Sequence, residues 1–251
     1  MPNWCENTLD IQTTKEVWDT YLKDLLFVEI EPGQVVGTPT EYGRFSFAAL
    51  KRTPIELEGV SAPNRIVTRE EYQKWLSTVY WSPKDNEQDF MMRSRPVTQE
   101  TYDKYMAIYG CANWYDWRLQ NWGCKWDADC YNFEFAIRET FGNDLVNVRI
   151  NFSTPWSPPS NWFDALTDVC MDKGIYMELR YSEEGMGFAG TYFFDDNKMW
   201  ESDGEIYQVD DSTGQKVTYD ELTGRWRNES GHFVAEDCVR SEVNYDTSAL
   251  W

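Results

Sequence analysis

Residues 117–128 read Trp117-Arg118-Leu119-Gln120-Asn121-Trp122-Gly123-Cys124-Lys125-Trp126-Asp127-Ala128, with Gly123 as the only backbone break. The three tryptophans carry more apolar surface than a solvent-exposed loop needs. This density of aromatic, amide and charged side chains predicts either a packed corner of the fold or one wall of a ligand site.

The segments on both sides carry the periodicities of regular structure. Alternating polar and apolar residues predict strands at 7–12, 44–50, 131–137, 146–152, 176–181 and 188–194. Apolar residues at helical spacing predict one helix between Thr14 and Leu26 and another after the turn at 154–159. Without an insertion at 62–115, this order approaches an α+β, ferredoxin-like βαββαβ sandwich with an extra hairpin.

The chain divides into three predicted parts. Residues 1–61 and 116–195 form the core, 62–115 a helical aromatic-rich insertion, and 196–251 an acidic extension. Within the insertion, Thr68 and Glu71 have the spacing of a capping box, and Gly110 is expected to end a second helix. The Tyr and Trp residues of these helices fit an amphipathic pair packed on the core, or an aromatic ligand wall.

The extension concentrates negative charge. Residues 195–246 hold 14 acidic and 5 basic residues, a net charge of −9. Two alternating segments, 205–209 and 215–219, flank a turn at 210–214 and predict a hairpin. A recognition face on this part would be acidic, and its candidate residues are Asp195, Asp196, Asp210, Asp211, Asp220 and Glu221.

Composition limits the classes of function. The chain has 251 residues, 41% of them hydrophobic, and a net charge of −20. That charge argues against direct nucleic-acid binding, and it fits either plain solubility or a surface that approaches a basic partner. No apolar run reaches the roughly 18 residues of a membrane span, and the first residues do not resemble a signal peptide, so we expect a cytoplasmic protein without a membrane partner.

No catalytic pattern emerges from the residues. The chain has one histidine, His232, and six cysteines without a CxxC pair. It contains no Gly-rich phosphate loop before a helix and no nucleophile elbow. We therefore expect no enzymatic activity, no cofactor and no metal.

The aromatic stretch supports two interpretations. In the first, Trp122 and Trp126 fill the core while Lys125 and Asp127 form a surface pair. In the second, tryptophans stack on a flat ligand such as a nucleobase and polar side chains hold its edge. The candidate pocket residues are Asn121, Trp122, Lys125, Trp126, Asp127, Trp156 and Glu184.

Four motifs together resemble the YubB-like proteins of phages and plasmids. They are Asn3-Trp4-Cys5-Glu6-Asn7, Trp122-Gly123-Cys124-Lys125-Trp126-Asp127-Ala128, Thr154-Pro155-Trp156-Ser157-Pro158-Pro159, and the hairpin from Tyr181 to Gly190. Cys124 and Pro155 stand where that family usually has threonine and alanine. The resemblance covers about 1–50 and 117–195, and it implies a ferredoxin-like domain encoded by a mobile element.

Two functions follow as expectations. The first is a phage- or plasmid-encoded accessory protein that inhibits a host defence or nucleic-acid-acting protein through an acidic, DNA-mimicking surface. Its partner would be a basic or nucleic-acid-binding host protein. The alternative is a protein that binds or sequesters a nucleotide in a Trp-rich pocket.

Overall fold

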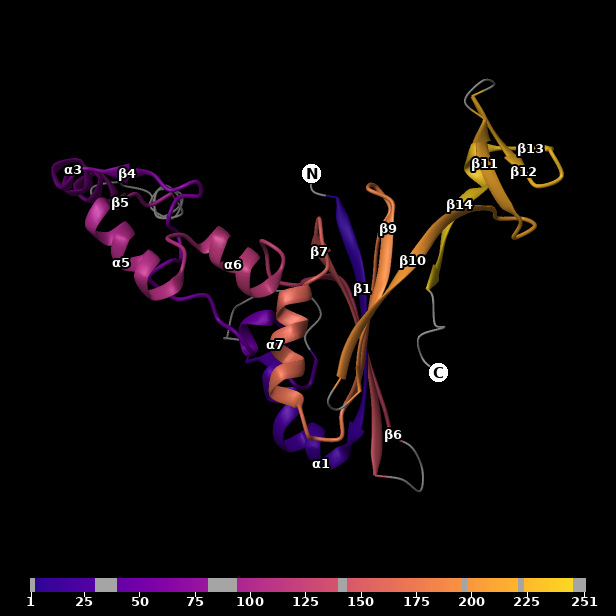
Figure 1. The fold of residues 1–251 in the computed structure, drawn as a ribbon, viewed down its shortest axis with the longest axis horizontal. Helices are drawn as coiled ribbons and strands as arrows, with labels where there is room; N and C mark the ends of the chain where they lie inside the picture. Colours follow the sequence, from indigo (N-terminus) through magenta and orange to yellow (C-terminus); the bar gives the residue numbers. More distant parts are fainter. Residues whose placement is uncertain are drawn as a thin grey trace.

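One large antiparallel sheet organises the molecule. A computed structural model of the chain describes residues 3–29, 40–80, 94–139, 144–195, 198–220 and 224–245. Ten strands form the sheet in the order β13-β12-β11-β10-β9-β8-β1-β7-β6, with β14 also paired to β10 (Figure 1). The α+β class, with a large antiparallel sheet and few helices, is confirmed.

Four strands form the centre of the sheet. Their spatial order is β8-β1-β7-β6, and their bounds are β1 Trp4–Thr14, β6 Asp129–Glu139, β7 Leu145–Pro155 and β8 Tyr176–Glu183. Along β1 every second side chain, such as Leu9 and Ile11, is buried. The strands predicted at 7–12, 131–137, 146–152 and 176–181 are confirmed.

Two helical segments cover one face of these strands (Figure 1). The first runs through α1 Lys15–Val17, the π-helical η1 Trp18–Leu22 and α2 Lys23–Leu26. The second is α7 Ser160–Cys170. Both were predicted, and both bury their aromatic and aliphatic side chains against the sheet. We call the opposite face of β8, β1, β7 and β6 the open face.

The strand predicted at 44–50 is wrong. Only Arg44–Phe45 forms a strand, β3, and it pairs with β2 Phe27–Val28 outside the large sheet. The chain then turns into the short 3-10 helix η2 Phe47–Ala49 because the Ser46 hydroxyl caps the Ala48 amide. The alternating Phe45 and Phe47 bury their rings in the aromatic core instead of lying on a sheet face.

Within the described residues, the insertion holds two helices and one short parallel strand pair, and a third helix begins at its end and extends beyond residue 115. Their bounds are α3 Arg69–Tyr80, α5 Gln99–Tyr109, α6 Trp114–Trp122, β4 Ile66–Val67 and β5 Val97–Thr98. The predicted capping box is present, because Thr68 and Glu71 exchange hydrogen bonds of 2.8 and 3.2 Å. Gly110 ends α5 in the left-handed conformation, as predicted. Helix α6 was not predicted; Asn113 caps its start and Gly123 ends it.

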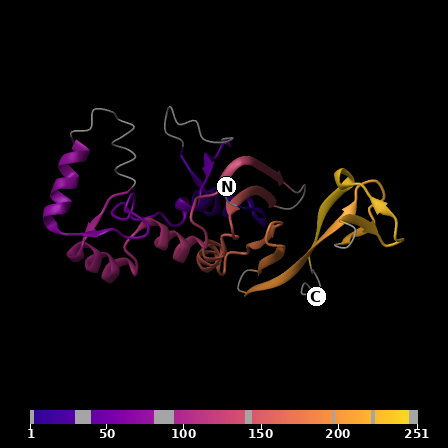
Figure 2. The ribbon, with the colours of Figure 1, turned by 90° about the horizontal axis from the view of Figure 1, so that it is seen from above.

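The C-terminal strands continue the large sheet. Their bounds are β9 Phe188–Asp195, β10 Lys198–Asp210, β11 Lys216–Asp220, β12 Arg225–Asn228, β13 Phe233–Val234 and β14 Val239–Tyr245, with η3 Glu236–Cys238 before β14. The first half of β10 pairs with β9, and its second half pairs with β14 and briefly with β11. The insertion helices and these last strands lie at opposite ends of the molecule (Figure 2). No helix within the described ranges is long and apolar enough to cross a membrane.

Candidate functional site

A chain of buried and partly buried hydrogen bonds joins three of the four motifs at one end of the sheet. The Asn7 side-chain amide donates to the Cys5 carbonyl at 2.8 Å and to the Thr154 hydroxyl at 2.9 Å. Thr154 donates to the Ser157 carbonyl at 2.7 Å, and the Ser157 hydroxyl donates to the Gly123 carbonyl at 2.9 Å. These bonds fix the start of β1, the end of β7 and the loop after α6 against one another.

The fourth motif, the β8–β9 hairpin, reaches the same end. The buried Glu183 carboxylate accepts from the amides of Gly185 and Met186 at 3.0 and 2.6 Å and so closes the turn. A Cβ on Gly185 would lie 2.4 Å from the Asn3 side-chain nitrogen, so a larger residue there would require the Asn3 side chain to move. The turn at 184–187 therefore lies directly against the start of β1.

Three tryptophans are exposed where these motifs meet. Trp4, Trp126 and Trp156 have exposed fractions of 37, 39 and 44%. The rings of Trp4 and Trp126 are 6.3 Å apart, and the Trp156 amide donates to the Asn3 carbonyl at 2.9 Å. Trp156 holds a left-handed φ of 74°, which is strained for a bulky residue and marks a candidate site. We call Trp4, Trp126 and Trp156 the tryptophan end.

A hollow of about 400 Å³ lies beside Trp4. Its lining comes from the start of β1 and from the β8–β9 hairpin: Asn3, Trp4, Glu6, Ser182, Glu183, Glu184 and Gly185. Glu6 accepts a hydrogen bond from Ser153 at 2.9 Å, and Glu184 is exposed. The hollow thus combines an aromatic ring with carboxylates, which is the chemistry that suits a cation.

The residues predicted for a ligand pocket separate into two groups. Lys125, Trp126, Trp156 and Glu184 lie at or beside the tryptophan end. The Lys125 ammonium lies 4.1 Å from the centre of the Trp126 ring. Trp4, which was not among the predicted site residues, completes the exposed aromatic set; its alternation within β1 gave no sign that its face was uncovered.

The other predicted pocket residues are structural. Trp122 is 2% exposed and donates from its ring nitrogen to the Lys51 carbonyl at 2.8 Å, so it cannot stack on a ligand. The Asn121 side chain donates to the Trp117 carbonyl within α6. The expectation that Trp122, Trp126 and Trp156 form one stacking wall is therefore wrong.

Asp127 organises the turn at η2. Its carboxylate accepts from the Phe47 amide at 2.7 Å, the Ser46 hydroxyl at 2.5 Å and its neighbouring Ala128 amide at 2.9 Å. Arg44 lies 3.7 Å from the same carboxylate. The predicted Lys125–Asp127 surface pair is therefore wrong, because each side chain has other contacts.

The predicted acidic residues also have structural contacts. Asp210 accepts from the Ser212 and Thr213 hydroxyls at 2.6 and 2.9 Å, and these hydrogen bonds hold its pKa below the ordinary value. Asp211 pairs with Arg240 at 2.7 Å and Asp220 with Arg227 at 2.8 Å. Asp195 is exposed, while Asp196 and Glu221 lie outside the described residues. Asp210, Asp211 and Asp220 therefore do not present free carboxylates as one face.

The cysteines near the tryptophan end are not reactive thiolates. Burial raises the pKa of Cys5 to about 12, and burial likewise raises the pKa of Cys124. A thiol with so high a pKa stays protonated and is a poor nucleophile.

In the portion of the chain that the structure describes, no three His, Cys, Asp or Glu side chains are grouped to hold a metal ion.

Comparison with known proteins gives a family match for part of the chain. A search of curated proteins finds no match. The crystal structure of a protein api92 from Yersinia pseudotuberculosis is similar at 11% sequence identity and a TM-score of 0.36, over 80% of this chain and 98% of that chain. Residues 131–220 match the family model described as "Ferredoxin-like domain in Api92-like protein". The match names Api92-like protein and not the YubB-like proteins expected from the motifs, and it supports a ferredoxin-like domain in this chain.

Proposed function

We propose that this protein binds a basic partner protein through the tryptophan end. One observation carries the proposal: three exposed tryptophans from separate segments meet beside a hollow lined by Trp4, Glu6 and Glu184. Tryptophan is the residue type most enriched among those that dominate binding energy in protein interfaces.

The rings and carboxylates favour a lysine or arginine side chain from the partner. A cation over an indole ring contributes about 0.5 to 2 kcal/mol, depending on how far water is excluded. Lys125 over Trp126 already shows this geometry within the chain. Trp4, with Glu6 and Glu184 beside it, offers the same chemistry to a cation from outside.

The net charge of −20 also favours binding of a basic partner. It attracts a basic partner over a distance of about one Debye length, roughly 8 to 10 Å at physiological salt, and it speeds association. The acidic surface therefore steers the partner, while the tryptophan end supplies the contact. This division differs from a recognition face built on the extension, where Asp210, Asp211 and Asp220 are taken up by hydrogen bonds and ion pairs.

The biological setting is part of the same proposal. The βαββαβ ferredoxin-like unit of this proposal is supported by the order β1, α1–α2, β6, β7, α7, β8 and by the sheet order β8-β1-β7-β6. With the resemblance of the motifs to YubB-like proteins, we infer an accessory protein of a phage or plasmid that inhibits a host protein. The partner class is a basic or nucleic-acid-binding protein of the host cytoplasm, and no catalytic step is assigned.

The test is affinity capture from a bacterial host lysate with the tagged full-length chain. The wild-type protein is expected to retain a basic protein at low salt and less of it at high salt. The variant Trp4→Ala/Trp156→Ala should lose about 2 kcal/mol of binding or more, a reduction of about 30-fold. Both side chains are exposed, so the fold is expected to survive.

The matched control is Tyr219→Ala/Phe233→Ala, which removes two exposed aromatics from the extension. This control should retain the partner as the wild type does. Equal retention by the tryptophan variant, or loss with the control alone, would contradict the proposal. Thermal stabilisation by a nucleotide that is abolished by Trp126→Ala would favour the sequestering alternative instead.

A further inference from the structure

The outer edge of β6 is the margin of the large sheet. Strand β6 spans Asp129–Glu139 and pairs with β7 on one side. No strand among the described residues pairs with its other side. A long unpaired edge exposes backbone donors and acceptors that readily accept another strand.

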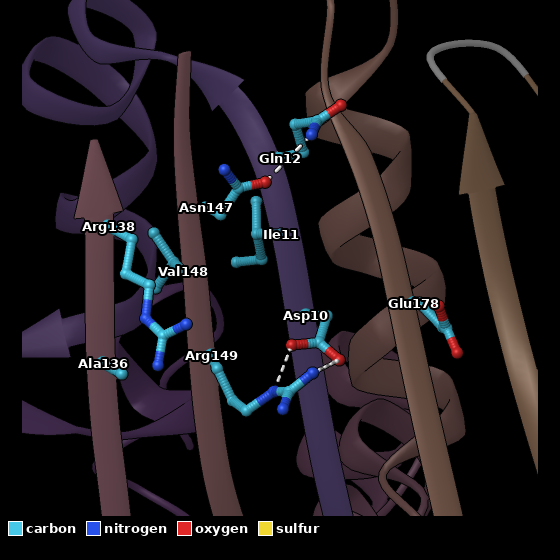
Figure 3. Close-up of a pocket in the computed structure, with 9 residues that line it drawn as sticks. All are labelled: Asp10, Ile11, Gln12, Ala136, Arg138, Asn147, Val148, Arg149 and Glu178. Atoms are coloured by element: carbon cyan, nitrogen blue, oxygen red, sulfur yellow. Dashed lines mark hydrogen bonds and ion pairs between the residues drawn. The ribbon is translucent and has the colours of Figure 1, made fainter. Parts of the chain in front are cut away.

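Near the middle of the open face, the charges of Asp10, Arg149, Arg180 and Glu178 are paired with one another. Asp10 on β1 accepts from Arg149 on β7 at 2.6 Å (Figure 3). Asp10 also accepts from Arg180 on β8, and Arg180 lies 3.3 Å from Glu178. Arg138 on β6 is exposed and forms no ion pair with any residue that the structure describes. Its register partner on β7 is the neutral Asn147.

Residues 134–138 of β6 are self-complementary about Ala136. An antiparallel pair of β6 strands centred there would place residue 134 of one copy opposite residue 138 of the second. These positions hold Glu134 and Arg138, and their partners on β7 are the uncharged Asn151 and Asn147. Opposite charges across an antiparallel pair stabilise it.

The apolar positions on either side of Ala136 fit the same arrangement. Phe135 and Ile137 pack only partly against the core, so each leaves apolar surface at the margin. The pairing sets Phe135 of one copy opposite Ile137 of the second and removes more of that surface from water. Ala136, which lines a hollow of about 360 Å³ on the open face, meets its own copy at the symmetry axis, where a small side chain avoids a clash (Figure 3).

We propose that two copies of this chain associate through β6, in an antiparallel pair centred on Ala136 that makes one continuous sheet. The contact is isologous, because the same surface of both copies takes part. It lies on a different surface from the tryptophan end and does not rest on the proposed function.

Sedimentation velocity over a range of concentrations tests this pairing on the full chain. The wild type is expected to dimerise, more weakly at high salt. Arg138→Glu and Glu134→Arg each set like charges opposite one another twice per dimer, so each should weaken association about tenfold or more. The double variant Glu134→Arg/Arg138→Glu restores both attractions and should return association to near the wild-type level.

Restored association in the double variant would distinguish this contact from a general effect of net charge. The control Lys104→Glu makes the same change of charge as Arg138→Glu at an exposed position on α5, and it should leave dimerisation unchanged. A wild-type chain that remains monomeric at every concentration would overturn the proposal. So would a double variant no stronger than the single variants, or an equal loss with Lys104→Glu.

Discussion

Tyr181 and Gly190 show how single residues set the end of the sheet. The Tyr181 hydroxyl donates to Glu201 at 2.7 Å, and a Cβ on Gly190 would lie 2.3 Å from that hydroxyl. We expect Gly190→Ala to cost about 1 to 3 kcal/mol in the free energy of unfolding, because the buried ring must move. Urea unfolding measures this cost. The control Gly214→Ala meets nothing within 4 Å and should cost only its backbone strain; an equal or smaller cost for Gly190→Ala would contradict the packing argument.

Asp127 gives a second prediction at this scale. Replacing it with alanine leaves the Phe47 amide and the Ser46 hydroxyl without their acceptor. We expect Asp127→Ala to lower the free energy of unfolding by about 2 to 3 kcal/mol. Asp144→Ala, at an exposed position, is the control and should change stability little. Full stability of Asp127→Ala, measured by thermal or urea unfolding, would reopen a ligand role for this carboxylate.

Burial of the Cys5 thiol affects both its reactivity and the pH dependence of its contribution to stability. Its pKa rises from 9.0 to about 12 on burial, so iodoacetamide at pH 8 should modify Cys5 only after the protein unfolds. Because the folded pKa exceeds the unfolded one, the stability contributed by this group is complete below pH 9 and is lost as the pH rises toward 12. Peptide mass mapping after alkylation checks the first statement. Rapid labelling of Cys5 in the native protein would contradict it.

Sequence patterns alone could not separate buried from exposed tryptophans. Trp122 and Trp126 are four residues apart in one motif, yet one lies in the core and the other in water. The helix end at Gly123 separates them and redirects the chain. Burial of a particular ring depends on which distant element covers it, and local spacing does not carry that information.

Among the elements, those with local end signals were predicted best. The helices α3 and α5 carry capping residues at their starts, and α7 follows a proline-rich turn. The segment 44–50 was predicted wrongly because its alternation arises from rings packed in a core and not from a pleated strand. The sequence also gave no sign that β10 would join the main sheet through β9, because pairing between strands is a long-range property.

The capping box of α3 supports a prediction at this scale. Thr68→Ala removes the hydroxyl that accepts from the Glu71 amide, so the first turn of α3 should fray, at a cost of about 1 kcal/mol. Amide hydrogen exchange over 68–72 is expected to accelerate, with little change in the β-sheet. Thr78→Ala, on an exposed position of the same helix, serves as the control. Unchanged protection at 68–72 would show that the box does not stabilise this helix end.

At the scale of the whole molecule, the tryptophan end exists only because strands distant in the sequence pair in the sheet. Trp4 and Pro155 are register partners across β1 and β7, although about 150 positions separate them in the chain. The four motifs were visible in the sequence, and their meeting point was not. The net charge of the molecule could be calculated from its composition. The ion pairs of Asp211 and Asp220 could not be predicted in that way, because they depend on the fold.

Site-specific photo-cross-linking tests the central claim most directly. A photoreactive residue replaces either Met186, which is exposed in the turn beside Asn3, or Tyr219 in the extension, and the protein is irradiated in host lysate. We expect a basic host protein to cross-link from position 186 and not from 219, and the cross-link to disappear in Trp4→Ala/Trp156→Ala. Cross-linking from position 219 alone, or an unchanged yield from 186 in that variant, would contradict binding through the tryptophan end.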